Sequence, residues 1–315
     1  MSKAYFEILR SGINTTYQDI GRPQLYHIGI PFSGAMDKRN FLIANKLVGN
    51  NLKSAVIEFA LQGPLLKLKN SETTFAITGN VKFNIIRKSS NIEKGICYKT
   101  YNLKHDEQID IISTDKSVYG YLSTEGGYDI ELFWNSFSVN TKAKIGPNYG
   151  EKLLNNQKIF LKKKLSNHLE KKIDLINSKI EFIRVIKGTN YDYFSEKSKS
   201  LFAKQEYKVS KLTDRMGMRL EGEILENNID TNIKSEGLIK GVIQVPADGK
   251  PIIMLSDHGT IGGYPKIAVV ISADYDKLVQ LPPNTKVKFK LVNLKEAENL
   301  YELYTLETEN ILSRI

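Results

Sequence analysis

A chain of 315 residues is long enough for two ordinary domains or one large one. Its 41% hydrophobic and 25% charged residues are typical of a globular protein and exclude a disordered chain. No apolar stretch approaches the roughly 20 residues of a membrane-spanning helix, and the first residues lack the apolar core of a signal peptide. The single cysteine, Cys97, excludes an internal disulfide, so we expect a cytoplasmic protein without membrane attachment.

The net charge of +10 raises the question of nucleic-acid binding. The lysines, however, are spread along the whole chain and mixed with acidic residues, and the densest run spans only residues 162–164 and 171–172. Zinc-finger spacing and the interleaved aromatic and basic residues of RNA-binding strands are both absent from the sequence. We therefore predict a solvated basic surface and no nucleic-acid partner, while an anionic substrate or acidic partner also suits the charge.

The first part of the chain is predicted to form short strands and one helix. Strands are expected at 75–78 and 81–86, with Gly79-Asn80 as a hairpin turn between them, and at 117–123. The helix begins after Asp37, which can cap it, and ends at Gly49. Its apolar face is formed by Phe41, Ala44, Leu47 and Val48.

The last part of the chain has the same character. Strands are predicted at 180–186, 241–245, 251–255 and 267–271, a helix at 193–202 and a closing helix at 293–306. Short, closely spaced strands favour antiparallel sheets or barrels over a doubly wound parallel sheet. We predict a mainly β chain with a few helices in two lobes, with an N-terminal subdomain at 1–165, a charged linker at 166–179 and a C-terminal subdomain at 180–315.

A first candidate site precedes the predicted helix. Asp19, Gly21 and Arg22 lie close together, and a loop rich in glycine and proline leads from His27 to Asp37. Such a loop at a helix start can direct backbone N–H groups at an anion. The alternative is a pair of turns leading into a capped helix.

A second candidate site follows the strand at 251–255. Asp257 and His258 can take part in acid–base chemistry, Gly262 and Gly263 let the backbone approach a ligand, and Lys266 can neutralise a carboxylate or phosphate. The alternative is a wide hairpin loop in which Asp257 and His258 bind turn backbone.

Several familiar motifs are absent from the sequence. It contains no P-loop, no G-x-G-x-x-G and no paired metal ligands of the zinc type, so we predict no metal site. The segment 35–38 resembles the biotin-attachment tetrapeptide only superficially, because Asp37 stands where the modified lysine would be, so we expect no covalent biotin on this chain.

A resemblance to a known family adds information that the spacing of the residues does not give. Resemblance to the opening of the allophanate-hydrolase-subunit-2 family is found in the segments 12–23, 29–31, 33–37, 44–50, 58–64 and 78–79. Further matches follow in family order at 210–222, 235–237, 241–246, 248–251, 262–268 and 271–274. Together they cover most of residues 8–290. One departure is the segment 133–139, where the family usually carries a Gly-Ser-Arg-Ser-Thr stretch and this chain has no arginine.

That family includes the C subunit of ATP-dependent 5-oxoprolinase and the carboxyltransferase domain of urea carboxylase. The resemblance implies two cyclophilin-like β-barrel lobes, a B-type (kinase inhibitor-like) subunit and an A-type subunit as partners, and ATP as co-substrate, with or without Mg²⁺. The implied reaction opens 5-oxo-L-proline to L-glutamate as ATP becomes ADP and phosphate. The alternatives are a carboxyltransferase component of a biotin-dependent urea or amide carboxylase, or a non-catalytic regulator that binds the B-type subunit.

We assign candidate roles on this basis. Asp19 and Asp37 in the first half of a cleft, and Asp257 and His258 in the second, are the candidate catalytic residues, with Asp257 or His258 as general base. Substrate or nucleotide binding is assigned to Arg22, His27, Asp214, Arg215, Gly262, Gly263 and Lys266.

Overall fold

The chain is mainly β in the computed structural model, with 33% of residues in strands, 19% in helices and a nearly closed barrel sheet. This structure describes residues 3–162, 170–174, 181–227 and 232–315. It forms two compact units: unit 1 comprises Met1–Arg22, Ser33–Ile176 and Thr308–Ile315, and unit 2 comprises Pro23–Phe32 and Asn177–Glu307. The predicted fold class is confirmed.

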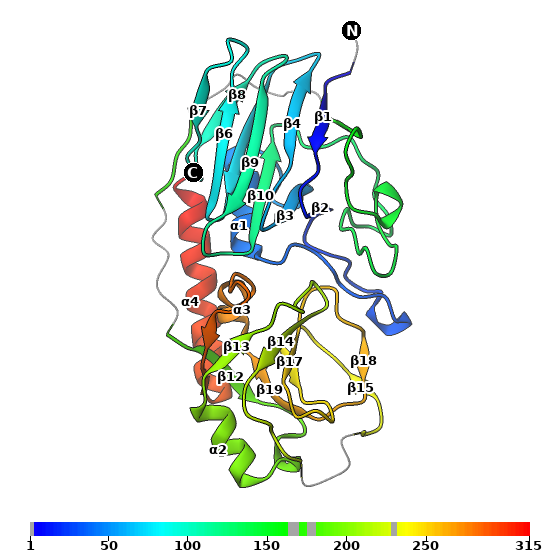
Figure 1. Cartoon of the computed structure of the whole chain (residues 1–315), viewed down its shortest axis with the longest axis vertical. Coiled ribbons are helices and arrows are strands. Elements are labelled where there is room, and N and C mark those ends of the chain that lie inside the picture. Colours follow the sequence, from blue (N-terminus) through cyan, green and yellow to red (C-terminus); the bar gives the residue numbers. More distant parts are fainter. Residues whose placement is uncertain (1–2, 163–169, 175–180, 228–231) are drawn as a thin grey trace. The chain divides into compact units, whose positions relative to one another are not determined.

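Unit 1 contains two antiparallel sheets (Figure 1). The six-stranded sheet has the order β11-β1-β4-β9-β6-β7 and consists of β1 (Tyr5–Arg10), β4 (Leu65–Lys69), β6 (Val81–Ile86), β7 (Ile92–Lys94), β9 (Gln108–Thr114) and β11 (Lys158–Phe160). The five-stranded sheet has the order β2-β3-β10-β5-β8 and consists of β2 (Asn14–Gln18), β3 (Val56–Ala60), β5 (Thr73–Thr78), β8 (Thr100–Leu103) and β10 (Tyr119–Thr124). A short 3-10 helix, η2 (Asn148–Gly150), lies in the long segment between β10 and β11.

The hydrophobic core of unit 1 lies between these two sheets, because alternate residues of each strand face it. The six-stranded sheet contributes Phe6, Ile8, Leu66, Leu68, Phe83, Ile85, Ile109 and Ile111, and the five-stranded sheet contributes Ile57, Phe59, Phe75, Ile77, Tyr101, Leu103 and Leu122. The rings of Phe75 and Phe83 meet edge to face at 6.4 Å between centroids and join the two sheets.

Strands β5 and β6 are present as predicted, but the predicted hairpin between them is wrong. β5 pairs with β10 and β8, whereas β6 pairs with β9 and β7. The turn at Gly79-Asn80 therefore leads from one sheet to the other, and Gly79 has a φ of +97° there. β5 is buried on both faces, because Phe75 and Ile77 face the core while Ala76 faces helix α1 (Lys38–Leu47).

Helix α1 packs on the outer face of the five-stranded sheet. The predicted apolar face is buried: Phe41, Ala44, Leu47 and Val48. Asp37 caps the helix as predicted, since its Oδ1 accepts a hydrogen bond from the backbone N of Asn40 at 3.0 Å. Gly49 follows the helix with a φ of +74°, a conformation that residues with a Cβ adopt at a cost.

Unit 2 contains an eight-stranded sheet with the order β20-β13-β14-β17-β16-β19-β12-β21. Its strands are β12 (Ile183–Lys187), β13 (Tyr207–Val209), β14 (Gly217–Glu221), β16 (Val242–Gln244), β17 (Ile252–Met254), β19 (Lys266–Val270), β20 (Lys286–Val287) and β21 (Phe289–Leu291). A two-stranded sheet pairs β15 (Glu236–Gly237) with β18 (Ile261–Gly262). The helices are η1 (Tyr26–Ile28), η3 (Tyr191–Tyr193), α2 (Glu196–Lys204), α3 (Ser272–Val279) and α4 (Leu294–Ser313), whose last residues belong to unit 1.

Most elements predicted in this part of the chain are present. Strands β12, β16, β17 and β19 and helices α2 and α4 overlap their predicted ranges. Helix α3 was not predicted, because the residue at its N-cap position, Ile271, makes no side-chain hydrogen bond and so gives no capping signal. Strands β17 and β19 both pair with β16, so the loop between them is not a hairpin loop.

The predicted subdomain boundaries stay a prediction. Residues 166–169 and 175–179 of the predicted linker lie outside the described residues, and unit 2 also includes Pro23–Phe32. None of the helices in the described ranges is long and apolar enough to cross a membrane.

Candidate functional site

A buried ion pair joins Arg215 and Asp257 in unit 2. Gly217 of β14 lies opposite Met254 of β17, which makes the residues before β14 and after β17 neighbours. Arg215 Nε donates to Asp257 Oδ2 at 2.8 Å and Nη2 to Oδ1 at 3.1 Å, and the two side chains are only 6% and 3% exposed. The backbone N of Asp257 also donates to the carbonyl of Arg215 at 2.9 Å. This bidentate pair engages both carboxylate oxygens and fixes the loop after β17.

Asp214 has a different environment from its neighbour Arg215. It is exposed, and its Oδ1 accepts hydrogen bonds from the backbone N of Met216 at 2.8 Å and of Gly217 at 3.2 Å. This turn orients the chain just before β14 and so helps to place Arg215.

His258 follows Asp257 and is also buried. Its Nδ1 lies 2.6 Å from the carbonyl oxygen of Gly259, and its ring meets the ring of Tyr26 at 6.0 Å between centroids. Burial lowers the pKa of His258 below its ordinary value, and this outweighs the opposing effects of the hydrogen bond to Gly259 and of the adjacent Asp257 carboxylate. His258 is therefore a neutral imidazole at neutral pH.

Lys266 begins strand β19 and its side chain is 4% exposed. Its Nζ donates to Glu236 Oε2 of β15 at 2.7 Å and lies 3.5 Å from Asn190 Oδ1, which also accepts from the Lys266 backbone N at 3.1 Å. The Glu236 side chain is 44% exposed, and the hydrogen bond from Lys266 lowers the pKa of its carboxyl. The Lys266 ammonium is thus buried, and it is paired with a carboxylate that is partly exposed to solvent.

The two glycines of this loop lie close to neighbouring atoms of the protein. A Cβ on Gly262 would lie 2.7 Å from Gln244 Nε2 and 2.8 Å from Leu238 Cδ1, and one on Gly263 would lie 3.1 Å from the Ile233 carbonyl oxygen. Their predicted role at a ligand stays a prediction.

Asp19 and Arg22 lie together in unit 1 and share the segment 136–138. Asp19 Oδ1 accepts from Ser136 Oγ at 2.7 Å and from Ser138 Oγ at 2.5 Å, and Arg22 Nη2 donates to the Ser138 carbonyl oxygen. Both side chains are buried. The segment that departs from the family pattern therefore holds these two predicted site residues in internal contacts.

The remaining two candidates of the first half have different local environments. Asp37 caps α1 and accepts from Asn40 Nδ2 at 2.6 Å. The backbone N of Met36, where an anion was expected to bind, already donates to Glu58 Oε2 at 2.8 Å. His27 is exposed in η1 and belongs to unit 2.

Unit 2 thus brings together Arg215, Asp257 and His258 in one cluster and holds Lys266 in another. Sequence reasoning assigned no role to Glu236, Asn190 or Tyr26, which contact these residues. Glu236 lies in a segment with family resemblance, and that was the one available signal, since each contact joins positions far apart in the chain.

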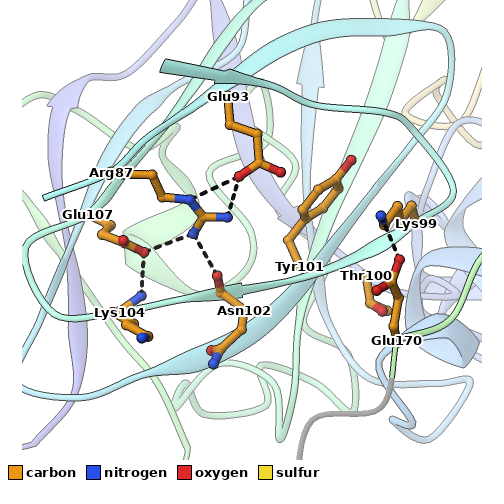
Figure 2. A pocket seen from close by; sticks show the side chains of 9 residues that line it. All are labelled: Arg87, Glu93, Lys99, Thr100, Tyr101, Asn102, Lys104, Glu107 and Glu170. Carbon is orange, nitrogen blue, oxygen red and sulfur yellow. Dashed lines mark hydrogen bonds and ion pairs between the residues drawn. The ribbon is translucent and has the colours of Figure 1, made fainter. Parts of the chain in front are cut away.

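A cavity of about 410 Å³ lies elsewhere, on unit 1 (Figure 2). Its lining contains no predicted site residue and consists of Arg87, Glu93, Lys99, Thr100, Tyr101, Asn102, Lys104, Glu107 and Glu170. Figure 2 shows Arg87 between Glu93 and Glu107, and Lys99 beside Glu170. The nitrogen–oxygen distance is 2.5 Å from Arg87 to Glu93, 3.0 Å from Arg87 to Glu107 and 2.6 Å from Lys99 to Glu170. The charges of this cavity offset one another, so we assign no chemistry to it.

Comparisons with known proteins agree with the family resemblance of the sequence. A family profile described as carboxyltransferase domain, subdomain A and B, matches residues 28–291. The chain is 31% identical to the C subunit of 5-oxoprolinase from Escherichia coli, covering 92% of each sequence, and 31% identical to the same subunit from Haemophilus influenzae, covering 93% of each. The solved structure of Kluyveromyces lactis urea carboxylase matches with a TM-score of 0.88 and 26% identity, over 99% of this chain and 29% of that chain.

Proposed function

The chain belongs to the family of carboxyltransferase domains with subdomains A and B, and on this premise we propose that it is the C subunit of an ATP-dependent 5-oxoprolinase. The observation that carries this proposal is the match along nearly the whole length of two relatives, each named as the C subunit of 5-oxoprolinase. A chain that matches 92–93% of a protein named as a subunit is expected to work with other subunits. We propose a B-type and an A-type subunit as these partners, in a cytoplasmic complex.

The proposed reaction converts 5-oxo-L-proline, ATP and water into L-glutamate, ADP and phosphate. A lactam is a poor electrophile, and phosphorylation of its oxygen makes a far better one, which explains the need for ATP. ATP, with or without Mg²⁺, is a substrate of this reaction and not a resident cofactor.

We place the chemistry contributed by this chain in unit 2. Asp257 and His258 are the candidates for proton transfer, and Lys266 is the candidate for holding a carboxylate or phosphate. Lys266 suits this role better than Arg215, because its partner Glu236 is 44% exposed. An anion can compete with an exposed carboxylate more easily than with the buried, bidentate Asp257.

A second candidate is a carboxyltransferase component that acts on urea or another amide. The TM-score of 0.88 to urea carboxylase favours it. The chain spans only 29% of that protein, however, so a carboxylase would need further chains that carry biotin and the remaining activities. The match to nearly the whole C subunit of 5-oxoprolinase therefore ranks the oxoprolinase first.

The test is release of glutamate and phosphate from 5-oxoproline and ATP by this chain co-purified with its B-like and A-like partners. We expect release that stops when this chain is omitted. An assembled complex that releases neither product would reject the proposal. Carboxylation of urea when biotin-carrying partners are supplied would then establish the second candidate, and its absence would leave a regulatory role.

A matched pair of variants tests the proposed role of Lys266. Lys266→Met should lower kcat/KM by about 10²–10³-fold, because it removes the proposed anion-binding charge. Lys250→Met, at an exposed position of the same unit, should leave kcat/KM unchanged. Equal rates in both variants would remove Lys266 from the site.

A further inference from the structure

The two candidates for proton transfer differ in their availability. Both oxygens of Asp257 are bound by Arg215, at 2.8 and 3.1 Å, in a pair that is almost completely buried. Protonating Asp257 would break this buried, bidentate ion pair, which is strongly unfavourable. Asp257 is therefore suited to hold charge and poorly suited to accept a proton.

His258 is placed differently. A carbonyl oxygen can only accept a hydrogen bond, so the 2.6 Å contact with the Gly259 oxygen requires the hydrogen on Nδ1. In a neutral imidazole this leaves the lone pair on Nε2. The contact thus selects one tautomer and presents Nε2 as a proton acceptor.

Tyr26 orients the same ring. Its hydroxyl donates to the carbonyl oxygen of Leu238, next to β15, and its ring meets that of His258 at 6.0 Å with an interplanar angle of 64°. Tyr26 also contacts Phe32, at 5.4 Å between ring centroids. Tyr26 therefore connects the strand that carries Glu236 with His258.

The charged groups around His258 act in opposite directions on its protonated form. Asp257 stabilises the protonated form, Lys240 opposes it, and the charge of Arg215 is offset by its pair with Asp257. Tyr26 adds a neutral ring at 6.0 Å between centroids. Burial lowers the pKa of His258 more than Asp257 raises it.

We infer that His258 is the general base of this site, held as the Nδ1–H tautomer, and that Tyr26 is a positioning residue for it. The inference rests on the proposed function and specifies the proton that is moved. Nε2 takes the proton of the substrate amide N–H, and the released electron pair moves onto the carbonyl oxygen. That oxygen forms a bond to the γ-phosphorus of ATP as the bond from phosphorus to the ADP oxygen breaks, and ADP leaves with those electrons.

The first experiment measures the tautomer without any turnover. The chain contains four histidines, so ¹⁵N-histidine NMR can assign His258 by comparison with His258→Gln. We expect the Nδ1–H form and a titration below the ordinary pKa of 6.5. An Nε2–H tautomer would overturn the inference, whatever the substrate of the complex proves to be.

The second experiment measures kcat/KM against pH in the reconstituted complex. The wild type should lose activity as His258 becomes protonated at acid pH. His258→Gln should lower kcat/KM by about 10²–10⁴-fold and remove that acid limb. His258→Asn serves as a second variant if His258→Gln does not fold. An acid limb that persists in both variants would assign the base to another group.

The positioning role of Tyr26 is tested by the titration of His258, which a purely structural role would not change. Tyr26→Ala should admit water to His258, raise its pKa toward 6.5 and move the acid limb of the pH profile to higher pH. Tyr26→Phe keeps the ring and should restore most of the wild-type titration. Identical titration of His258 in the wild type and Tyr26→Ala would exclude the positioning role. A wild-type complex inactive on 5-oxoproline would reject the proposed function but leave the NMR result intact.

Discussion

The Asp19 carboxylate accepts hydrogen bonds at 2.5–2.8 Å from four donors: Gly21 N, Ser136 Oγ, Phe137 N and Ser138 Oγ. A buried carboxylate with this many donors orders the surrounding loops. Asp19→Asn turns one acceptor into a donor that faces other donors. We expect the free energy of unfolding to fall by about 1–3 kcal/mol, measured by urea denaturation.

The control for this variant is Asp214→Asn. Asp214 is exposed, and the asparagine oxygen can accept the same two backbone hydrogen bonds, so we expect a change within about 0.5 kcal/mol. If Asp19→Asn is as stable as the wild type but inactive in the reconstituted complex, the catalytic role predicted from the sequence is favoured.

The lowered pKa of His258 also makes stability depend on pH. The unfolded chain, with an ordinary histidine pKa of 6.5, takes up a proton before the folded chain does. Between the lowered folded pKa and 6.5 the unfolded state therefore binds more protons, and the free energy of unfolding falls as the pH falls. As the pH falls from about 7 to 5, we expect the urea concentration at the unfolding midpoint to decrease more steeply in the wild type than in His258→Gln. Parallel curves would contradict a buried neutral imidazole.

At the scale of elements, helix α1 depends on its N-terminal cap. Asp37→Ala removes the acceptor for the backbone N of Asn40 and should destabilise the helix by about 0.5–2 kcal/mol. The measurement is hydrogen exchange of the α1 amides, which should speed up. Asp37→Ser keeps a capping oxygen and should exchange at a rate close to the wild type. Similar acceleration in both variants would indicate that the negative charge matters more than the cap.

Helices and strands could be predicted where their sequence pattern is local, but the pairing of the strands could not. The cap at Asp37 and the glycine at Gly49 bound α1 correctly, because both signals lie within one segment. The error at Gly79-Asn80 arose because a short turn between two β-rich segments favours a hairpin, while the chain changes sheets there. The burial of every residue of β5 reflects contacts on both faces, which a local pattern does not specify.

The candidate site shows the same limit. Family resemblance covered Arg215, and the loop after the strand at 251–255 suggested Asp257. These residues are 42 positions apart, and their ion pair depends on the pairing of β14 with β17. Tyr26 lies 212 positions from Leu238, the residue to which its hydroxyl donates. Long-range contacts of this kind are set by tertiary packing, so the sequence supplied the residues and the fold supplied their partners.

At the scale of the molecule, the chain exchanges segments between its two compact units. Pro23–Phe32 belongs to unit 2 although it lies between segments of unit 1, and Thr308–Ile315 belongs to unit 1 although it ends helix α4. Composition changes mark a linker but do not reveal such exchanges, since each short segment has an ordinary composition. Each unit is therefore completed by residues distant in the sequence.

The end of α4 provides a test of this exchange. Ile311, Leu312 and Ile315 pack against the cluster that includes Ile43 and Leu47 of α1. Combined Ile311→Ala and Leu312→Ala substitutions remove apolar contact from half-buried positions, and we expect unit 1 to lose about 2 kcal/mol. Hydrogen exchange should accelerate in α1, because its outer face loses this cover.

Leu303 and Leu306 supply the matched control on the same helix, since they are 56% and 61% exposed. Alanine at both positions keeps the helix propensity and removes similar volume, so the α1 amides should exchange as in the wild type. If the two double variants accelerate hydrogen exchange in α1 equally, the effect comes from α4 as a whole. Acceleration confined to the variant at 311 and 312 means that the last turns of α4 are part of the unit 1 core.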